Sequence, residues 1–233
     1  MIKKIKNSVC IIPARGGSKR IPLKNIKNFC GKPIISYSIK NAIKSKLFDK
    51  VIVSTDNNRI ANISREYGAE IHIRSSKFSD DTTDTPTVIR NVIKYLENKK
   101  LFYKKICCIY PTSVFTKPKQ LIFGYKKLNK NINYVFSAIK YDHPIHRSFY
   151  IKKGKINSVF ANMDKRRTQD LPQTFYDAGQ FYFGWRNSWM NKKKIFSGNS
   201  EFLEISKFRS QDIDDIKDWE NAQIIWKFNK NFK

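Results

Sequence analysis

Residues 11 to 25 read IIPARGGSKRIPLKN, and this stretch decides the fold class. An apolar run ends in a pair of glycines, where the backbone at Gly16 and Gly17 can approach a phosphate closely and donate N–H groups to it. A strand ending here would deliver the loop to the edge of a parallel sheet, where α/β folds bind ligands. The stretch predicts an anion-binding loop, with a basic surface turn as the plainer alternative. The loop also carries four basic side chains, Arg15, Lys19, Arg20 and Lys24.

The pattern on either side of this loop predicts the architecture. Apolar, strand-like runs alternate with helical periodicity through the first 140 residues, which is typical of an α/β fold with a doubly wound, mostly parallel sheet. Pro33 suits the first turn of a helix, and Asp84 or Thr85 can cap another. The expected strands are 9–12, 51–54, 71–73, 106–109 and 135–139, and the expected helices are 33–45, 58–67, 85–99 and 117–128.

The pattern changes after residue 140. Residues 141–180 contain a hairpin signal around Gly154 and a polar stretch at 162–170, and predict an excursion from the sheet that serves as a lid or a dimer contact. Strand character returns at 181–183 and 202–205, and a helix over 216–228 closes the chain. A chain of 233 residues fits a single domain with this inserted excursion.

Composition narrows the functional classes. No apolar stretch approaches the ~20 residues of a membrane span, so we expect a cytoplasmic protein without a membrane partner. The four cysteines have no metal-site spacing, and we expect neither disulfides nor structural zinc. The net charge of +27 comes from lysines spread along the whole chain. This charge favours anionic substrates, and without a recognition signature it predicts no specific nucleic-acid binding.

Polar residues follow each predicted strand. Asp56 is interpreted as a helix cap, while Arg74 and the acidic and threonine residues at 80–85 can read the edge of a base. Tyr110 ends the next strand. Because parallel strands end at one sheet edge, these groups should meet the basic loop.

Asp212 and Asp214 supply an acidic counterpart to this loop. Alternate residues of an extended segment point to the same side, so the two carboxylates can hold Mg²⁺ together. Alternatively, Asp214, Asp215 and Asp218 cap the helix that begins near residue 216.

These strings together resemble the cytidylyltransferases that activate nine-carbon acidic sugars, the CMP-sialic acid synthetases and their relatives. The similarity runs from residue 11 to about residue 219 and implies a Rossmann-like nucleotidyltransferase fold. The family pattern A-R-x-G-S-K-x-x-P-x-K-N matches at Arg15, Ser18, Lys19, Pro22, Lys24 and Asn25. The resemblance implies nucleotide binding by Ala14, Arg15, Gly16, Ser18, Lys19, Lys24, Asn25, Arg74, Thr83 and Thr85.

The resemblance also implies the remaining roles. Arg15, Lys24 and Asp214 are the catalytic candidates, and Asp212 and Asp214 are the ligands of a Mg²⁺ cofactor. A homodimer is expected on the same ground. The acidic-sugar region contains Arg167, Gln169, Gln180 and Tyr182.

Departures from the family pattern narrow the subgroup. Tyr110 stands where sialic acid enzymes usually carry glutamine, and the Ser-Gly-Thr-Asp-Arg segment of octulosonate enzymes is absent. The strings at 169–172 and 177–182 are more similar to pseudaminic acid cytidylyltransferases. The implied reaction transfers CMP from CTP to the anomeric hydroxyl of a nonulosonic acid. Pseudaminic acid is the expected acceptor, and N-acetylneuraminic and legionaminic acid are the alternative acceptors. A nucleotidylyltransferase for another sugar and a basic nucleic-acid-binding protein are the alternatives.

Overall fold

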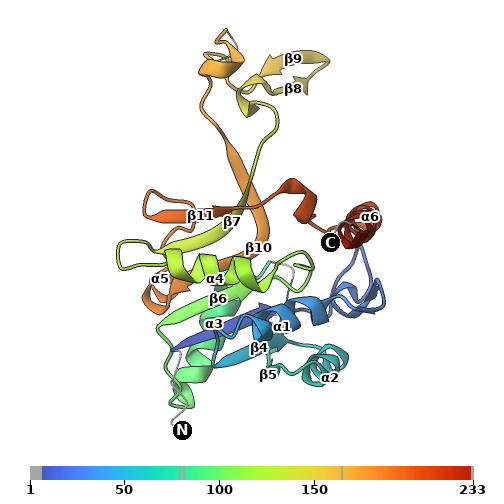
Figure 1. The fold of residues 1–233 in the computed structure, drawn as a ribbon, viewed down its shortest axis with the longest axis vertical. Helices are drawn as coiled ribbons and strands as arrows, with labels where there is room; N and C mark the ends of the chain where they lie inside the picture. The colour runs from blue at the N-terminus through green and yellow to red at the C-terminus, as the bar shows by residue number, and fades with distance from the viewer. Residues whose placement is uncertain (1–6, 79, 81, 164, 232–233) are drawn as a thin grey trace.

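A single seven-stranded sheet organises the chain (Figure 1). A computed structural model describes residues 7–78, 80, 82–163 and 165–231. The strand order is β11-β7-β10-β6-β1-β4-β5, and only β10 runs antiparallel to its neighbours β6 and β7. The prediction of a mostly parallel α/β sheet is confirmed. The strands of the sheet are β1 (Ser8–Pro13), β4 (Lys50–Thr55), β5 (Glu70–Ile73), β6 (Lys105–Ile109), β7 (Tyr134–Lys140), β10 (Phe175–Trp185) and β11 (Ser200–Glu204).

Helices cover both faces of the sheet because each central strand is apolar on both sides. In β1, Cys10 and Ile12 pack in one apolar cluster, whereas Val9 and Ile11 pack in a second one. The first cluster takes residues from α1, α2 and α4, and the second takes residues from α3 and α5. The helices are α1 (Ile35–Lys44), α2 (Asn58–Glu66), α3 (Thr85–Asn98), α4 (Pro118–Lys127), α5 (Arg186–Met190) and α6 (Ile216–Asn231).

The expected helices all form, with small corrections at their ends. Pro33 was expected inside the first helix, but it belongs to the two-residue strand β3 (Lys32–Pro33), which pairs with β2 (Asn28–Phe29). This short ribbon turns the chain before α1 begins. Asp84 is the N-cap of α3, where its carboxylate accepts a hydrogen bond from the Thr87 N–H at 2.8 Å.

The predicted excursion projects from the sheet as a separate lobe (Figure 1). It contains the hairpin of β8 (Phe149–Lys152) and β9 (Lys155–Ser158), whose pairing of Lys152 with Lys155 confirms the expected turn. The chain re-enters the sheet at Phe175, so the last residues of the 141–180 segment belong to β10.

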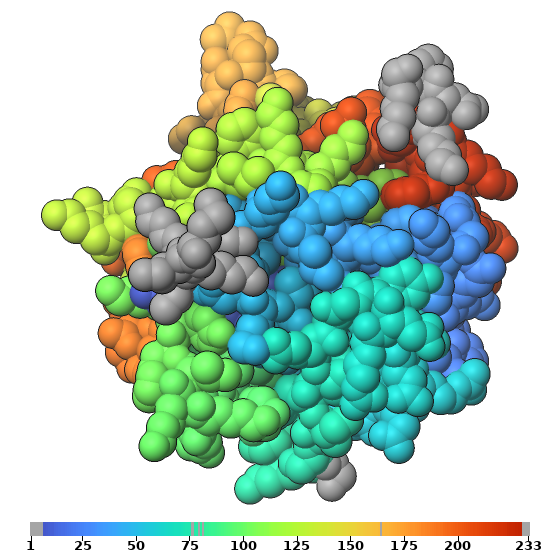
Figure 2. Space-filling view, turned by 60° about the horizontal axis from the view of Figure 1, so that its bottom comes forward, coloured from blue at the N-terminus to red at the C-terminus, as the bar shows by residue number. Residues whose placement is uncertain are grey.

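Two further expectations concern the cysteines and membrane-spanning helices. The four cysteines, all within the described residues, form no disulfide, and Cys10, Cys107 and Cys108 are buried. In the part of the chain that the structure describes, no helix is long and apolar enough to span a membrane. Figure 2 shows the face on which α1, α2 and α4 cover the sheet.

Candidate active site

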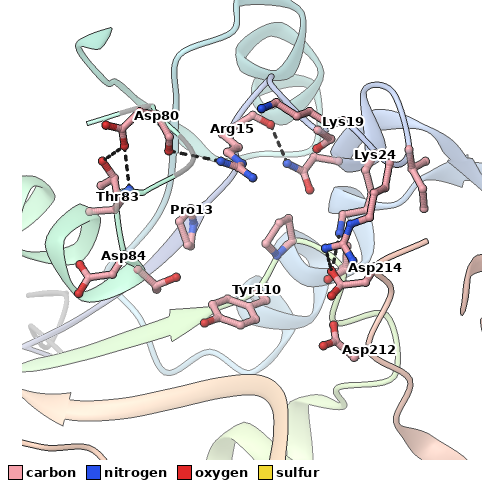
Figure 3. Close-up of a pocket in the computed structure, with 18 of the residues that line it drawn as sticks. Pro13, Arg15, Lys19, Lys24, Asp80, Thr83, Asp84, Tyr110, Asp212 and Asp214 are labelled. Atoms are coloured by element: carbon pink, nitrogen blue, oxygen red, sulfur yellow. Dashed lines mark hydrogen bonds and ion pairs between the residues drawn. The ribbon is translucent and has the colours of Figure 1, made fainter. Parts of the chain in front are cut away.

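A cavity of about 440 Å³ lies at the carboxyl ends of β1, β5 and β6 (Figure 3). The ends of these parallel strands meet there, and the polar residues that follow each strand lie together, as predicted from the sequence. The sequence-predicted residues that line it are Arg15, Ser18, Lys19, Lys24, Asn25, Arg74, Thr83, Thr85, Asp212 and Asp214. The lining also includes Arg20, Asp80, Asp84 and Tyr110, which the sequence placed in the loop or at this sheet edge without an individual binding role, and Thr112.

Of the two glycines in the loop, Gly16 is packed tightly against its neighbours and Gly17 is not. The Gly16 N–H donates to Oδ1 of Asp56 at 2.8 Å, and a Cβ built on Gly16 would lie 2.8 Å from the Asn57 side chain. Residue 16 therefore has no room for a side chain, whereas a Cβ on Gly17 would meet nothing within 4 Å. Neither Gly16 nor the buried Ala14 lines the cavity, so both act on the site only through the backbone of the loop.

Asp56 was interpreted as a helix cap, and the structure corrects this. The N-cap of α2 is Asn57, whose side chain accepts from the N–H groups of Arg59 and Ile60. Asp56 instead anchors the basic loop through Gly16. The cap moves by one residue because Asn57 has the extended backbone of a capping position, at φ −120° and ψ 123°.

Asn25 and Asp80 hold the first part of the loop. The buried Asn25 donates from Nδ2 to the Arg15 carbonyl at 2.9 Å. The guanidinium of Arg15 donates to the Asp80 carbonyl at 3.3 Å, which connects the loop to the segment before α3. That segment is fixed in turn because the carboxylate of Asp80 accepts from the Thr83 N–H at 2.7 Å. The Arg15 side chain is therefore held in the cavity lining by the segment before α3.

Lys24 joins the basic loop to the acidic segment far along the chain. Its ammonium donates to the Ile213 carbonyl at 2.5 Å and lies 3.6 Å from the Asp214 carboxylate. Arg20 approaches the same carboxylate at 3.1 Å. Figure 3 shows Lys24 and Asp214 pointing toward one another, with Asp212 beside them. Burial and the neighbouring Asp214 raise the pKa of the Asp212 carboxyl above its usual range.

The acidic segment divides its two predicted roles between different residues. The Asp215 carboxylate accepts from the Asp218 N–H at 2.9 Å, and Asp218 accepts from the N–H groups of Asp214 and Asp215. These two side chains satisfy the start of α6. The capping alternative is therefore confirmed for Asp215 and Asp218, while the carboxylates of Asp212 and Asp214 line the cavity.

Two carboxylates facing a cavity suit a hard cation that also binds phosphates. The residues that the structure describes contain no group of three or more histidine, cysteine or acidic side chains arranged to hold a metal. A metal at Asp212 and Asp214 would thus need further oxygen ligands from substrate or water, as Mg²⁺ commonly has. The donor set fits this ion.

Arg74 is a cation prepared for a ligand. Its side chain is 6% exposed and lines the cavity, and its Nε and Nη2 have no hydrogen-bond partner among the described residues. Burial lowers the pKa of this guanidinium, and the nearby Asp56 opposes that effect. A buried N–H group without a partner is costly, so an acceptor arriving in the cavity would bind here favourably.

Tyr110 forms part of the cavity wall, with Thr83 and Asp84 on one side and Asp212 and Asp214 on the other (Figure 3). Burial raises the pKa of its phenol to about 12, and its ring lies 5.5 Å from that of Tyr182. The phenol is therefore a neutral hydrogen-bonding group at physiological pH. Its position after β6 marked it in the sequence, but only the fold shows that it faces the cavity.

The four predicted sugar-binding residues lie outside the cavity. Gln180 is buried, where its amide accepts from Thr116 Oγ1 and donates to the Arg209 carbonyl. Tyr182 is also buried, and its hydroxyl donates to Asp177. Arg167 and Gln169 are exposed on the projecting excursion, with Arg167 paired to Asp170 at 2.8 Å. The structure brings none of the four to the cavity lining of its own chain.

Comparisons with known proteins show the family of the chain. A family model described as cytidylyltransferase matches residues 9–215, and the chain belongs to this family. The pseudaminic acid cytidylyltransferase of Campylobacter jejuni is 39% identical over 225 residues, which cover 95% of this chain and 97% of the relative. N-acylneuraminate cytidylyltransferase B of Danio rerio is 31% identical, with 94% of this chain and 51% of the relative covered.

A solved structure supports the fold independently. CMP:2-keto-3-deoxy-manno-octonic acid synthetase complexed with CTP superposes with a TM-score of 0.71 at 14% identity, covering 95% of this chain and 99% of the other. The α/β nucleotidyltransferase fold is therefore shown by structure as well as by sequence.

Proposed function

We propose that this chain transfers CMP from CTP to the anomeric hydroxyl of pseudaminic acid and releases pyrophosphate. The observation that carries the proposal is the cavity itself, where the cations of one loop face the carboxylates of Asp212 and Asp214. Family membership and the similarity to pseudaminic acid cytidylyltransferases support the same reaction.

The cationic side of the cavity would bind the nucleotide. Arg74 offers its buried Nε and Nη2 atoms, which have no hydrogen-bond partner in the described part of the chain, to an acceptor on the base or the ribose. Thr83 and Thr85 lie on the same side and can hydrogen-bond a base edge. Arg15, Lys19 and Lys24 carry the positive charge that a triphosphate requires.

The transfer step joins the sugar oxygen to the α-phosphorus. The anomeric oxygen attacks, the bond from the α-phosphorus to the bridging oxygen breaks, and its electron pair leaves with pyrophosphate. The hydroxyl proton passes to a base, for which Asp214 is the candidate in the cavity. Arg15 and Lys24 would offset the charge that grows on the leaving group, because preorganised cations stabilise such charge strongly.

Mg²⁺ is the proposed cofactor, held by Asp212 and Asp214. When bound, it would act as a Lewis acid toward the phosphate oxygens. Arg20 and Lys24 lie against the Asp214 carboxylate, at 3.1 Å and 3.6 Å.

The proposed acceptor follows from the relatives that match most of the chain. Pseudaminic acid is proposed because the relatives named for it match nearly the full chain at 37–39% identity. A synthase of CMP-N,N′-diacetyllegionaminic acid from Legionella pneumophila matches at 34%, but over only 48% of this chain. N-acetylneuraminic and legionaminic acid are therefore the alternatives.

The projecting excursion is the proposed homodimer contact. On its hairpin, Ile151 pairs with Ile156, and these side chains are 71% and 72% exposed. Exposed apolar side chains grouped in this way favour burial against a partner. Because Arg167 and Gln169 lie on the same lobe, away from their own cavity, a dimer is the arrangement in which they could meet an acidic sugar, in the cavity of the second copy.

Nucleotide selectivity tests the proposal. The purified chain, supplied with pseudaminic acid and Mg²⁺, should release pyrophosphate with CTP, and at least 100-fold more slowly with UTP, GTP or ATP. Equal rates with UTP would overturn the assignment to cytidine. Since the reaction consumes CTP, we also propose that the protein works in the cytoplasm, where this nucleotide is made.

A further inference from the structure

A second cavity, of about 450 Å³, lies outside the site described above. Its walls come from α1, from the loop before α4 and from the segment 209–229 that ends in α6, and it shares no lining residue with the first cavity. The figures show α1, α4 and the C-terminal segment as neighbours on this side of the molecule (Figures 1 and 2). Among its described lining residues there is no acidic side chain. Five are cationic: Lys32, Lys40, Lys44, Lys117 and Arg209.

Two of the lining lysines share one side of a helix with a buried hydroxyl. Ser36, Lys40 and Lys44 follow one another at four-residue intervals, which places them on one side of α1. In a chain with a net charge of +27, neighbouring lysines alone do not indicate a binding site. The Ser36 hydroxyl, however, is fully buried, lines this cavity and has no hydrogen-bond partner among the described residues. An unpaired buried hydroxyl costs stability, and an acceptor bound in the cavity would satisfy it.

One wall is aromatic. The Trp226 ring packs edge-on against Tyr37, at 4.8 Å and 71°, and against Phe29 at 5.9 Å and 78°. Trp226 and Tyr37 both line the cavity and are only partly buried. The supported indole can therefore receive a planar ring from the cavity side.

We propose that this cavity is a second nucleotide site, in which Lys44 and Lys40 hold the phosphate and Trp226 faces the base; the Lys40 ammonium, which lies 4.9 Å from the centre of the Tyr67 ring, would turn from that ring to the phosphate. Cations beside an aromatic surface recognise the two parts of a nucleotide, an anionic phosphate and a flat ring. The cavity volume is also close to that of the first site, about 450 Å³ against about 440 Å³.

An occupant would touch both ends of the segment that carries the acidic pair. Arg209 precedes Asp212 by three residues, and Trp226 lies in α6, which begins directly after Asp215. The Arg209 carbonyl is fixed by the Gln180 amide at 2.8 Å. A nucleotide bound here would thus be expected to change the apparent Mg²⁺ requirement of the first site through this segment.

Titration calorimetry with CMP tests the proposal. We expect two CMP molecules per wild-type chain, and one per chain in Lys40→Ala/Lys44→Ala. The matched control is Lys94→Ala/Lys126→Ala, which removes the same charge from exposed helix positions outside both cavities and should keep two sites. The same number of sites in the wild type and in Lys40→Ala/Lys44→Ala would overturn the proposal.

Further ligands and a second variant distinguish a general nucleotide site from a cytidine-selective site and from a site for phosphate alone. AMP that binds the wild type and is lost in Lys40→Ala/Lys44→Ala indicates a site for nucleotides in general, whereas binding of CMP alone indicates a cytidine-selective site. Binding of inorganic phosphate but of neither nucleotide would contradict the role of Trp226. Ser36→Ala keeps the helix, since alanine favours helices, and should weaken the second site at least tenfold. Unchanged affinity in that variant would contradict the role of the buried hydroxyl.

Discussion

Lys24→Ala should nearly abolish turnover while leaving the fold intact. Lys24 is the cation that joins the basic loop to the acidic segment, through the Ile213 carbonyl at 2.5 Å and Asp214 at 3.6 Å. Losing one preorganised donor at developing charge typically lowers the rate by ~100 to 1,000-fold, or about 3–4 kcal/mol. Losing the hydrogen bond to Ile213 should lower the free energy of unfolding by about 1–3 kcal/mol, because the donor is charged.

Lys27→Ala is the matched control. Lys27 is three residues further along the same loop, outside the cavity lining, with its ammonium 5.7 Å from the centre of the Trp219 ring. The Lys27→Ala substitution removes the same charge and the same side chain as Lys24→Ala. Pyrophosphate release and urea unfolding should be measured on both variants. The reasoning is refuted if Lys24→Ala retains activity within about fivefold of Lys27→Ala.

Four further predictions concern the metal, the nucleotide, stability and assembly. Asp212→Asn should raise the Mg²⁺ concentration for half-maximal activity at least tenfold; an unchanged titration would count against ligation. Arg74→Leu should raise the KM for CTP more than it lowers kcat, because it removes buried donors, and an effect on kcat alone would contradict nucleotide binding. The pKa of His72, lowered by burial from 6.5 to about 4, predicts that up to roughly 3 kcal/mol of stability is lost as the pH falls from about 6.5 toward 4, since only the unfolded chain then takes up the proton. Urea midpoints of His72→Gln should therefore depend less on pH than those of the wild type, and parallel curves would refute this. Ile151→Lys should convert the proposed dimer to monomer in light scattering, and an unchanged mass would count against the hairpin contact.

The sheet could be predicted because its central strands carry continuous apolar runs. The runs 9–12, 51–53 and 106–109 are apolar on both sides and lie in the adjacent strands β1, β4 and β6. The first half of β10 could not be found in this way. Its sequence, FYDAGQ, has no continuous apolar run; it pairs with β7 but not with β6, and its pairing with β7 shifts register between Asp177 and Tyr182.

The local parts of the site were predictable, and its long-range pairings were not. The basic loop and the Asp212–Asp214 alternation can each be seen in a short stretch of sequence. The approach of Arg20 to Asp214 depends on the path of the whole chain. Asp56 was misread because a cap and a loop anchor use the same carboxylate after the same strand.

The acceptor and the reaction can be tested together in one measurement. Pyrophosphate release should be followed with CTP and Mg²⁺ and, separately, pseudaminic, legionaminic and N-acetylneuraminic acids. The proposed function predicts release with pseudaminic acid at a rate at least tenfold above the other two. Release with another acid in preference would contradict the acceptor, and CTP binding without release with any of the three would contradict the reaction.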